Sequence, residues 1–444
     1  MGMDGLPVVD EVKCTGCGTC ERVCPKHIIT LSSVTRRIIR EYTSDDCTTP
    51  CQRACPAGID ICEYIKQIQL KNYNRSVQVI KERNPFPTVI GRICPRPCED
   101  VCRRQLRAEP VAINFLKRFV ADYEKEKGER VLPFKAPDTE RKIAVIGGGV
   151  QGLSTAFFSA RLGHAPTVFE ATQKLGGLLR SAIAKNRLPH DVLDWDIDGI
   201  IEMGVDTQTG QCLGKDITIH GLLNDGFDAV FLSLGGWDSR LSRGTKVGAE
   251  KPVPGLHLLM DVSKALKQTT STGITCGKNT ILAGGGELAI QTAILCKENG
   301  ADNTTVIFRE STENSGLPDE ILGEATDKGI HLIFGAGINK LFGEKDQLNK
   351  IEYVDRKSGT LHTLPADTLV IASGRFPELI FARPAMEASD TNETPTEEEK
   401  TSNDAQWEGF YALKHPHYNG EAGLLAKGDV LSDYSGAIKA IGAG

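Results

Sequence analysis

Four cysteines close to the N-terminus have the spacing that holds an iron–sulfur cubane. The motif reads C-x2-C-x2-C-x3-C-P, and its cysteines are Cys14, Cys17, Cys20 and Cys24. Three thiolates at this spacing wrap a [4Fe-4S] cluster from one tight loop, and the fourth, before a proline, can point to a second cluster. Zinc is the alternative, but zinc sites of this kind use two separated C-x2-C pairs. The spacing therefore favours a [4Fe-4S] cluster here.

A second group of cysteines extends to residue 102. Its two runs are Cys47-x3-Cys51-x3-Cys55-Pro and Cys94-x3-Cys98-x3-Cys102. A spacing of four would place side chains on one helix face, but the prolines within and after both runs favour loops that curl around a metal. Spacing alone leaves structural zinc open. Since 11 of the 14 cysteines precede residue 103 and no secretory signal is visible, metal binding is favoured over disulfides.

Two glycine loops follow in the remaining three quarters of the chain. In the first, Gly147, Gly149 and Gly152 form G-x-G-x-x-G between an apolar run and a helix-like stretch. The first glycine makes the turn, the second lets the backbone approach a diphosphate, and the third packs helix on strand. Glu170 ends the next apolar run, where it could bind a ribose hydroxyl. This combination predicts a dinucleotide site.

The second glycine loop follows the apolar run at residues 280–283. Its positions are Gly284, Gly286 and Ala289, and alanine is allowed in place of the third glycine. A second nucleotide site is therefore expected.

The stretches around these motifs indicate how they are positioned. Residues 41–123 carry apolar residues at three- and four-residue spacing, which predicts short helices between the cysteine-bearing segments. A polar linker containing prolines follows at 124–140. From Lys142 onward, apolar runs alternate with helix-like stretches, which predicts doubly wound α/β domains.

Composition excludes several classes of protein. A length of 444 residues predicts about three domains. The 52 basic and 58 acidic residues give a net charge of -6, which argues against a strongly basic nucleic-acid binder. No run of about 18 apolar residues and no N-terminal leader pattern is present, so we expect no membrane insertion and a cytoplasmic location.

From about Tyr42 the chain resembles the glutamate synthase small subunit. The segments that carry the resemblance are CQRACPAGIDI, GRICPRPCEDVCRRQ and EPVAINFLKRFVAD. The same helical iron–sulfur domain occurs in dihydropyrimidine dehydrogenase and in the large subunit of NADH-dependent ferredoxin:NADP oxidoreductase. Residues 1–36 in turn resemble one half of a bacterial ferredoxin.

The resemblance implies two clusters in the helical domain. Cys47, Cys51 and Cys102 would belong to one cluster, and Cys55, Cys94 and Cys98 to the other.

The chain departs from the family at three ligand positions. The family usually has another cysteine just upstream of Cys47, and Lys117 stands where dihydropyrimidine dehydrogenase uses a glutamine ligand. Cys62 stands where relatives often have proline, and it is either a substitute ligand or a buried thiol. Three cubanes need about 12 ligands, whereas this region offers 11 cysteines. Two or three clusters are therefore expected.

Resemblance also assigns the first glycine loop to FAD. The stretch KLGGLLRSAIAKNRLP is similar to the family segment that lines the flavin, and a Gly-Asp pair near the C-terminus resembles the segment that closes FAD sites. The implied FAD contacts beyond the loop are Gly176, Gly177, Leu178, Arg187, Gly428 and Asp429.

The second glycine loop corresponds to the family's NAD(P)H site. Glu287 and Gln291 replace an asparagine and an aspartate of the usual motif. Relatives that use NADPH carry two arginines after the next strand, and here these positions are Arg309 and Glu310. A carboxylate would repel a 2'-phosphate but could accept a bond from a ribose hydroxyl, so NADH is favoured. Gly374 lies in a turn that matches the family position beside the nicotinamide.

The expected fold is α/β, with two nested Rossmann-like (doubly wound) nucleotide-binding domains behind a small helical iron–sulfur domain and a ferredoxin-like segment. The expected ranges are 1–36 for the ferredoxin-like segment, 37–130 for the helical domain, 138–265 and 366–444 for the FAD domain, and 266–365 for the NAD(P) domain. No acid–base or nucleophilic catalytic set stands out, so the chemistry would belong to the cofactors.

The expected function is that of an electron-transfer subunit of a larger oxidoreductase, which passes electrons between NAD(P)H and 4Fe-4S clusters through FAD. Two alternatives stay open: a flavin-based electron-bifurcating subunit acting with ferredoxin, and a non-catalytic iron–sulfur conduit with a degenerate nicotinamide site. The expected partners are other redox subunits, with ferredoxin as one candidate. Half a ferredoxin leaves Cys24 without its cluster, so a docking surface is expected at the N-terminal segment.

Overall fold

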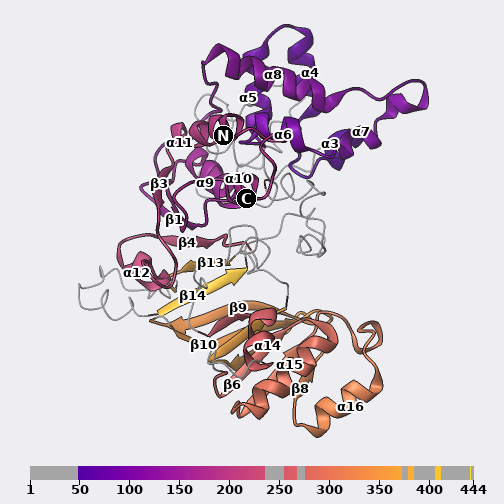
Figure 1. The fold of residues 1–444 in the computed structure, drawn as a ribbon, viewed down its shortest axis with the longest axis vertical. Helices are drawn as coiled ribbons and strands as arrows, with labels where there is room; N and C mark the ends of the chain where they lie inside the picture. The colour runs from indigo at the N-terminus through magenta and orange to yellow at the C-terminus, as the bar shows by residue number, and fades with distance from the viewer. Residues whose placement is uncertain are drawn as a thin grey trace, which may run out of the picture.

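The computed structural model describes residues 49–235, 255–267, 276–345, 347–372, 379–384, 406–411 and 441. Within these residues, a helical unit lies at one end of the molecule and a parallel sheet with its helices at the other, with a larger sheet between them (Figure 1). Eight predicted site residues lie outside the described residues: Cys14, Cys17, Cys20, Cys24, Cys47, Gly374, Gly428 and Asp429.

The helical unit is built from helices of 4 to 15 residues. They are α3 (Pro50–Ala54), α4 (Ile61–Gln69), α5 (Tyr73–Lys81), α6 (Pro87–Ile93), α7 (Pro97–Asp100), the 3-10 turn η1 (Arg103–Leu106) and α8 (Ile113–Lys127). Cys55 and Cys94 are the first residues after α3 and α6. Buried side chains such as Tyr64, Phe86 and Ile90 form the core of this unit, as the helical periodicity predicted.

The larger sheet joins a parallel half to an antiparallel half. Its order is β11-β10-β9-β14-β13-β4-β1-β2-β3. The parallel strands are β1 (Lys142–Ile146), β2 (Ala165–Glu170), β3 (Asp206–Thr209) and β4 (Ala229–Leu232). The antiparallel strands are β9 (Ala336–Glu344), β10 (Gln347–Asp355), β11 (Leu361–Pro365), β13 (Leu379–Ala382) and β14 (Gln406–Tyr411). The helices of this part are α9 (Val150–Arg161), α10 (Gly177–Ser181), α11 (His190–Glu202) and α12 (Ile219–Asn224).

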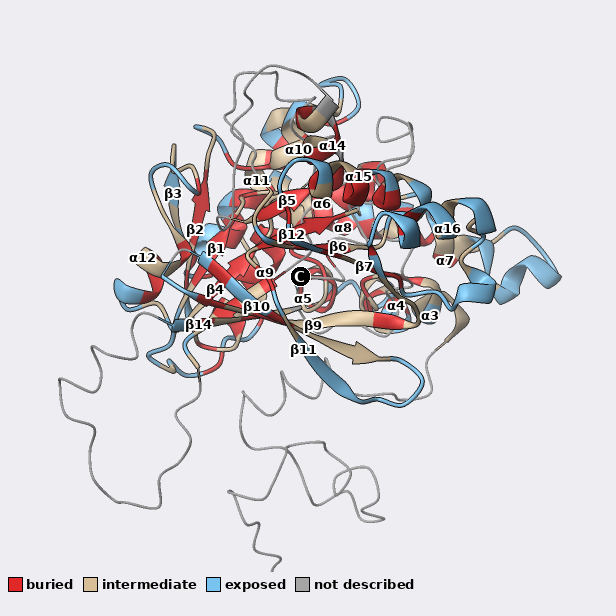
Figure 2. Cartoon of the chain, turned by 90° about the horizontal axis from the view of Figure 1, so that it is seen from below, coloured by how far each residue is buried: buried red, intermediate tan, exposed pale blue. Residues whose placement is uncertain are grey.

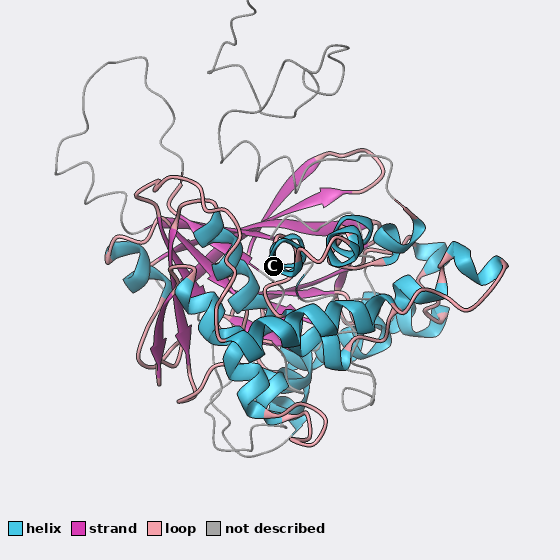
Figure 3. Cartoon of the chain, turned by 90° about the horizontal axis from the view of Figure 1, so that it is seen from above, coloured by secondary structure: helices cyan, strands magenta, loops and turns pink. Residues whose placement is uncertain are grey.

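The second sheet is parallel throughout, in the order β5-β12-β6-β7-β8. Its strands are β5 (Leu256–Leu258), β6 (Asn279–Ala283), β7 (Asn303–Ile307), β8 (His331–Ile333) and β12 (Thr368–Ile371). It carries α14 (Leu259–Lys267), α15 (Gly286–Glu298), the 3-10 turn η2 (Thr312–Asn314) and α16 (Asp319–Asp327). Buried residues concentrate in the strands of both sheets and on the helix faces that cover them (Figure 2), and the helical unit lies over the larger sheet when the molecule is seen from above (Figure 3).

The predicted α/β class, with parallel sheets behind a helical unit, is confirmed. The strand pairing, however, divides the chain differently from the expected ranges. β5 and β12 belong to the second sheet, although they fall in the ranges expected for the FAD domain. The meander β9–β11 belongs to the larger sheet, although it falls in the range expected for the NAD(P) domain. Apolar runs reveal strands but not their partners, because pairing is decided by contacts distant in sequence. In the part of the chain that is described, no helix is long and apolar enough to cross a membrane.

Candidate functional site

Three of the predicted metal-binding cysteines line one pocket. Cys55 and Cys94 line it from the ends of α3 and α6, Cys98 lines it from α7, and Lys117 lines it from α8. The rest of the wall is apolar or aromatic and includes Pro56, Ile59, Ile61, Tyr64, Pro97 and Ile113. The hydroxyl of Tyr64 donates to the carbonyl oxygen of Ile113, so it does not compete for the pocket. The structure therefore brings together the three cysteines that the resemblance assigned to one cluster.

Burial holds two of these thiols in their neutral form. Burial raises the pKa of Cys55, and it raises the pKa of Cys98 to about 12, while the nearby Lys117 lowers both. Neutral thiols are poor ligands, whereas metal coordination deprotonates a thiol outright. Among the described residues, no three His, Cys, Asp or Glu side chains converge closely enough to share a single metal ion.

Cys51 and Cys62 lie on either side of one hydroxyl group. The Oγ1 atom of Thr49 is 3.1 Å from the Sγ atom of Cys51 and 3.7 Å from that of Cys62. Cys62 is exposed, so the alternative of a buried thiol is wrong. It is the second residue of α4, and the preceding Asp60 caps that helix by accepting from the N–H of Glu63. Cys102 follows α7 and begins the 3-10 turn η1.

The first glycine loop has the geometry expected of a dinucleotide turn. Gly149 caps the N-terminus of α9, and a methyl group added there would meet no described atom within 4 Å. A methyl group at Gly152 would collide with the carbonyl oxygen of Gly147, which explains the third glycine. The carboxylate of the buried Glu170 accepts from the N–H of Gly148 at 2.8 Å and from Thr172. Glu170 therefore lies at the turn itself.

The segment assigned to the flavin packs against this turn. Gly176 N–H donates to the carbonyl oxygen of Gly148 at 2.8 Å, and a methyl group at Gly177 would lie 2.9 Å from the Cα atom of Gly149. Leu178 follows in α10 and is half-buried, whereas Arg187 is exposed in the turn before α11. Gly176 and Gly177 are thus brought to the loop.

The second glycine loop joins β6 to α15. Gly284 N–H donates to the carbonyl oxygen of Ile307 in the neighbouring strand, and Ala289 is fully buried in α15. A methyl group at Gly286 would meet no described atom within 4 Å, so the loop leaves space above the helix N-terminus. Arg309 and Glu310 are both exposed just beyond β7. The two loops therefore have the same placement at the carboxyl ends of their parallel strands.

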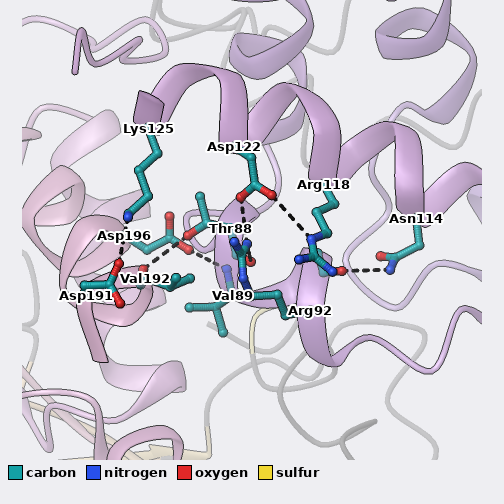
Figure 4. A network of polar contacts seen from close by, with 11 residues as sticks. Thr88, Val89, Arg92, Asn114, Arg118, Asp122, Lys125, Asp191, Val192 and Asp196 are labelled. Atoms are coloured by element: carbon teal, nitrogen blue, oxygen red, sulfur yellow. Dashed lines mark hydrogen bonds and ion pairs between the residues drawn. The ribbon is translucent and has the colours of Figure 1, made fainter. Parts of the chain in front are cut away.

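A buried contact joins the helical unit to the unit that holds the first loop. Asp196 on α11 accepts from the N–H of Val89 at 2.9 Å, and the hydroxyl of Thr88 donates to the carbonyl oxygen of Val192 at 3.2 Å (Figure 4). Burial raises the pKa of Asp196 to about 7, although the Val89 N–H lowers it. Sequence reasoning missed Asp196. Its signal was a carboxylate on the apolar face of α11, between Val192 and Ile200.

Comparisons with known proteins match three stretches of the chain to known domains. Residues 43–129 match the 4Fe-4S domain described as domain II of dihydropyrimidine dehydrogenase, residues 7–30 match a 4Fe-4S binding domain, and residues 145–197 match an NAD(P)-binding Rossmann-like domain. These matches define a class of protein that combines 4Fe-4S domains with a Rossmann-like NAD(P)-binding domain.

The relatives of this chain lie within that class. The NADP(+)-dependent formate dehydrogenase subunit beta of Moorella thermoacetica is 32% identical over 372 residues, which cover 75% of this chain and 52% of the relative. The NADPH-Fe(3+) oxidoreductase subunit beta of Geobacter sulfurreducens is 32% identical over 358 residues, covering 76% and 52%. The NAD-dependent dihydropyrimidine dehydrogenase subunit PreT of Escherichia coli K12 is 28% identical over 332 residues, covering 74% and 77%.

The chain is thus a homologue of these subunits, and the predicted resemblance to dihydropyrimidine dehydrogenase-like iron–sulfur proteins is confirmed. It spans about half the length of the first two relatives.

Proposed function

We propose that this chain is an electron-transfer subunit that carries electrons between NAD(P)H and its 4Fe-4S clusters through a bound FAD. The observation that carries the proposal is a shared core. Cys55 and Cys98 of the cysteine pocket belong to the same cluster of buried side chains as Leu153, Leu175 and Leu179, which surround the first glycine loop. The predicted cluster site and the predicted flavin site are therefore parts of one packed body.

FAD is proposed for the first loop because three features of this loop suit a bound dinucleotide. Open space lies above Gly149, the acidic Glu170 lies at the turn, and the Gly176-Gly177 segment lies against it. When bound, FAD would exchange electron pairs with a nicotinamide and single electrons with clusters. The chain's own residues would supply the helix N-terminus for the diphosphate and the acidic partner for the ribose. Arg187, Gly428 and Asp429 remain proposed contacts from resemblance.

The second loop is proposed to bind the nicotinamide cofactor, with NADH favoured over NADPH. Glu310 is exposed beyond β7, where a carboxylate would repel a 2'-phosphate. Arg309 beside it would weaken this preference without reversing it.

Three cluster sites are proposed. The first is held by Cys14, Cys17, Cys20 and Cys24, whose segment matches a 4Fe-4S domain. The second is held by Cys55, Cys94 and Cys98. The third is held by Cys47, Cys51 and Cys102, with Cys62 as the substitute ligand. Cys62 is chosen because its thiol and that of Cys51 both contact the hydroxyl of Thr49.

We also propose that the chain works with other redox subunits, since its relatives are named as subunits. Ferredoxin as a partner and a cytoplasmic location remain predictions from the sequence.

One observation favours the alternative of a conduit that does not use a nicotinamide cofactor. Glu287 lies in the first turn of α15 and accepts a hydrogen bond from the amide of Gln291 at 2.8 Å. A carboxylate there competes with a diphosphate for the positive end of the helix.

Anaerobic analysis of iron, labile sulfide and flavin tests the cofactor assignment. The proposal predicts one FAD per chain. Three cubanes would give about 12 irons per chain, and two cubanes would give about 8. A chain that contains iron but no flavin would contradict the proposal and would favour the alternative of an iron–sulfur conduit. The substitution Cys17→Ser is expected to interrupt transfer to a partner subunit while leaving reduction of the flavin nearly intact, and equal loss of both would contradict this assignment.

A further inference from the structure

The cysteine pocket contains a buried positive charge whose role the cluster assignment leaves unexplained. Lys117 lines the pocket with Cys55, Cys94 and Cys98, and its residue is only 6% exposed. Within the described part of the chain, its Nζ atom has no hydrogen-bond or ion-pair partner. An ammonium group in a mostly apolar pocket is stabilised by an anion that lies close to it. The pocket therefore favours an occupant that carries negative charge.

The nearby acidic side chain does not supply that charge. The charge of the Glu99 carboxylate raises the pKa of the Cys98 thiol. The Oε1 atom of Glu99, however, accepts a hydrogen bond from the backbone N–H of Asn114 at 2.8 Å. Its other oxygen lies 3.8 Å from Arg96. Three thiolates with the sulfides of a cluster would supply the missing negative charge instead.

The charge of Lys117 also argues against its acting as an iron ligand. An ammonium has three donors and no free electron pair, so ligation would require loss of its proton. The same side chain can instead donate hydrogen bonds to sulfur while keeping its charge.

We propose that Lys117 lies as a cation beside the cluster bound by Cys55, Cys94 and Cys98, at the position of a fourth ligand, and that its charge raises the reduction potential of this cluster. The proposal rests on the cluster assignment made above. An added electron is stabilised by a positive charge nearby, and the potential of a cluster depends on its net charge and on hydrogen bonds to its sulfurs.

The test is a redox titration of the full 444-residue chain, prepared anaerobically and followed by electron paramagnetic resonance. Dithionite supplies the electrons, so neither flavin nor NAD(P)H is required. Lys117→Met removes the charge with little change in size, and Lys117→Arg keeps it. Lys125→Met is the matched control, because Lys125 lies on the same helix but pairs with Asp191 at 2.8 Å, away from the pocket.

We expect Lys117→Met to lower the midpoint potential of one cluster by at least about 59 mV, a tenfold change in a one-electron equilibrium. Lys117→Arg is expected to shift it by less than half of that, and Lys125→Met not at all. Iron content should stay the same in all of these variants.

Two results would overturn the role of Lys117. One is an unchanged potential in iron-replete Lys117→Met. The other is loss of about one iron per chain in both Lys117→Met and Lys117→Arg, with the signal of a three-iron cluster, because this would make the lysine a ligand. If the methionine variant does not assemble, Lys117→Leu against Lys117→Arg makes the same comparison of neutral and charged side chains. Lack of iron in the unmodified chain would instead contradict the proposed function itself.

Discussion

The carboxylate of Asp196 on α11 binds the backbone N–H of Val89 in the first turn of α6, with an N···O distance of 2.9 Å (Figure 4). The same short helix ends at Ile93, so the next residue is the predicted cluster ligand Cys94. A residue from the unit of the first glycine loop thus stabilises the helix that positions a ligand of the cysteine pocket. A carboxylate at a helix N-terminus is favourable, but this one is buried and its Oδ1 atom has no hydrogen-bond partner among the described residues.

Asp196 should make stability depend on pH. Burial raises the pKa of its folded form to about 7, well above that of an unfolded aspartate. The folded state therefore holds the proton more tightly, and stability falls as pH rises from about 4 to about 7. The buried pair of Lys81 and Glu124 also acts on this carboxyl, with the lysine lowering and the glutamate raising its pKa.

We expect the free energy of unfolding of Asp196→Asn, taken relative to that of the unmodified chain, to rise by about 3 kcal/mol between pH 5 and pH 8. The figure comes from the two pH units between pH 5 and the folded pKa, over which the unmodified chain loses stability. Urea unfolding at both pH values measures the difference. Asp191→Ala on the same helix removes an exposed ion pair with Lys125, so it should change stability by less than about 1 kcal/mol at either pH. A pH-independent difference for Asp196→Asn would show that the carboxyl titrates normally.

The first glycine loop offers a matched pair of substitutions. Gly152→Ala forces a methyl group against the carbonyl oxygen of Gly147, so it should destabilise the fold by about 1–3 kcal/mol. Gly149→Ala meets no described atom within 4 Å, so the chain should fold normally while its bound FAD falls at least about tenfold. Thermal unfolding and flavin absorbance separate the two effects. Full FAD content in Gly149→Ala would place the diphosphate elsewhere.

Glu310 should set the choice between nicotinamide cofactors. Glu310→Arg replaces a carboxylate with a group that pairs with a 2'-phosphate, so the ratio of kcat/KM for NADPH to NADH should rise by about tenfold or more, which corresponds to 1.4 kcal/mol. Glu313→Arg in the nearby turn η2 makes the same change in charge and should leave the ratio within about twofold. Equal shifts in both variants would mean that overall charge, and not a specific contact, decides the preference.

Cys62 should be required for a complete cluster. Cys62→Ser is expected to lower the iron content by about one to four atoms per chain, according to whether one iron or the whole cluster is lost. Cys212→Ser, a half-buried cysteine outside the helical unit, is the control and should keep all iron. Unchanged iron in Cys62→Ser would leave the third cluster with a ligand from elsewhere.

Local patterns predicted the parts of the molecule that depend on neighbouring residues. The strands β1 and β6 and their glycine turns were predictable, because an apolar run that ends in glycines specifies a strand and turn within ten residues. The gathering of Cys55, Cys94 and Cys98 followed from resemblance, and the pocket confirms that they lie together.

Features that depend on distant contacts were not predictable in the same way. β12 pairs with β5 and β6, while the intervening β9–β11 return to the larger sheet, and no local signal distinguishes these strands. Asp196 was missed because its partner, Val89, is 107 residues away in the sequence. The exposure of Cys62 likewise depends on how α4 packs.

The most direct test of the central claim is rapid mixing of the oxidised, cofactor-replete chain with NADH under anaerobic conditions. Flavin and cluster absorbance are followed together, and rapid freezing captures the cluster signals. The account predicts that the flavin is reduced first and that cluster reduction follows within the same chain, without any partner. Clusters that dithionite reduces but NADH and NADPH leave oxidised, with the flavin also unchanged, would contradict it.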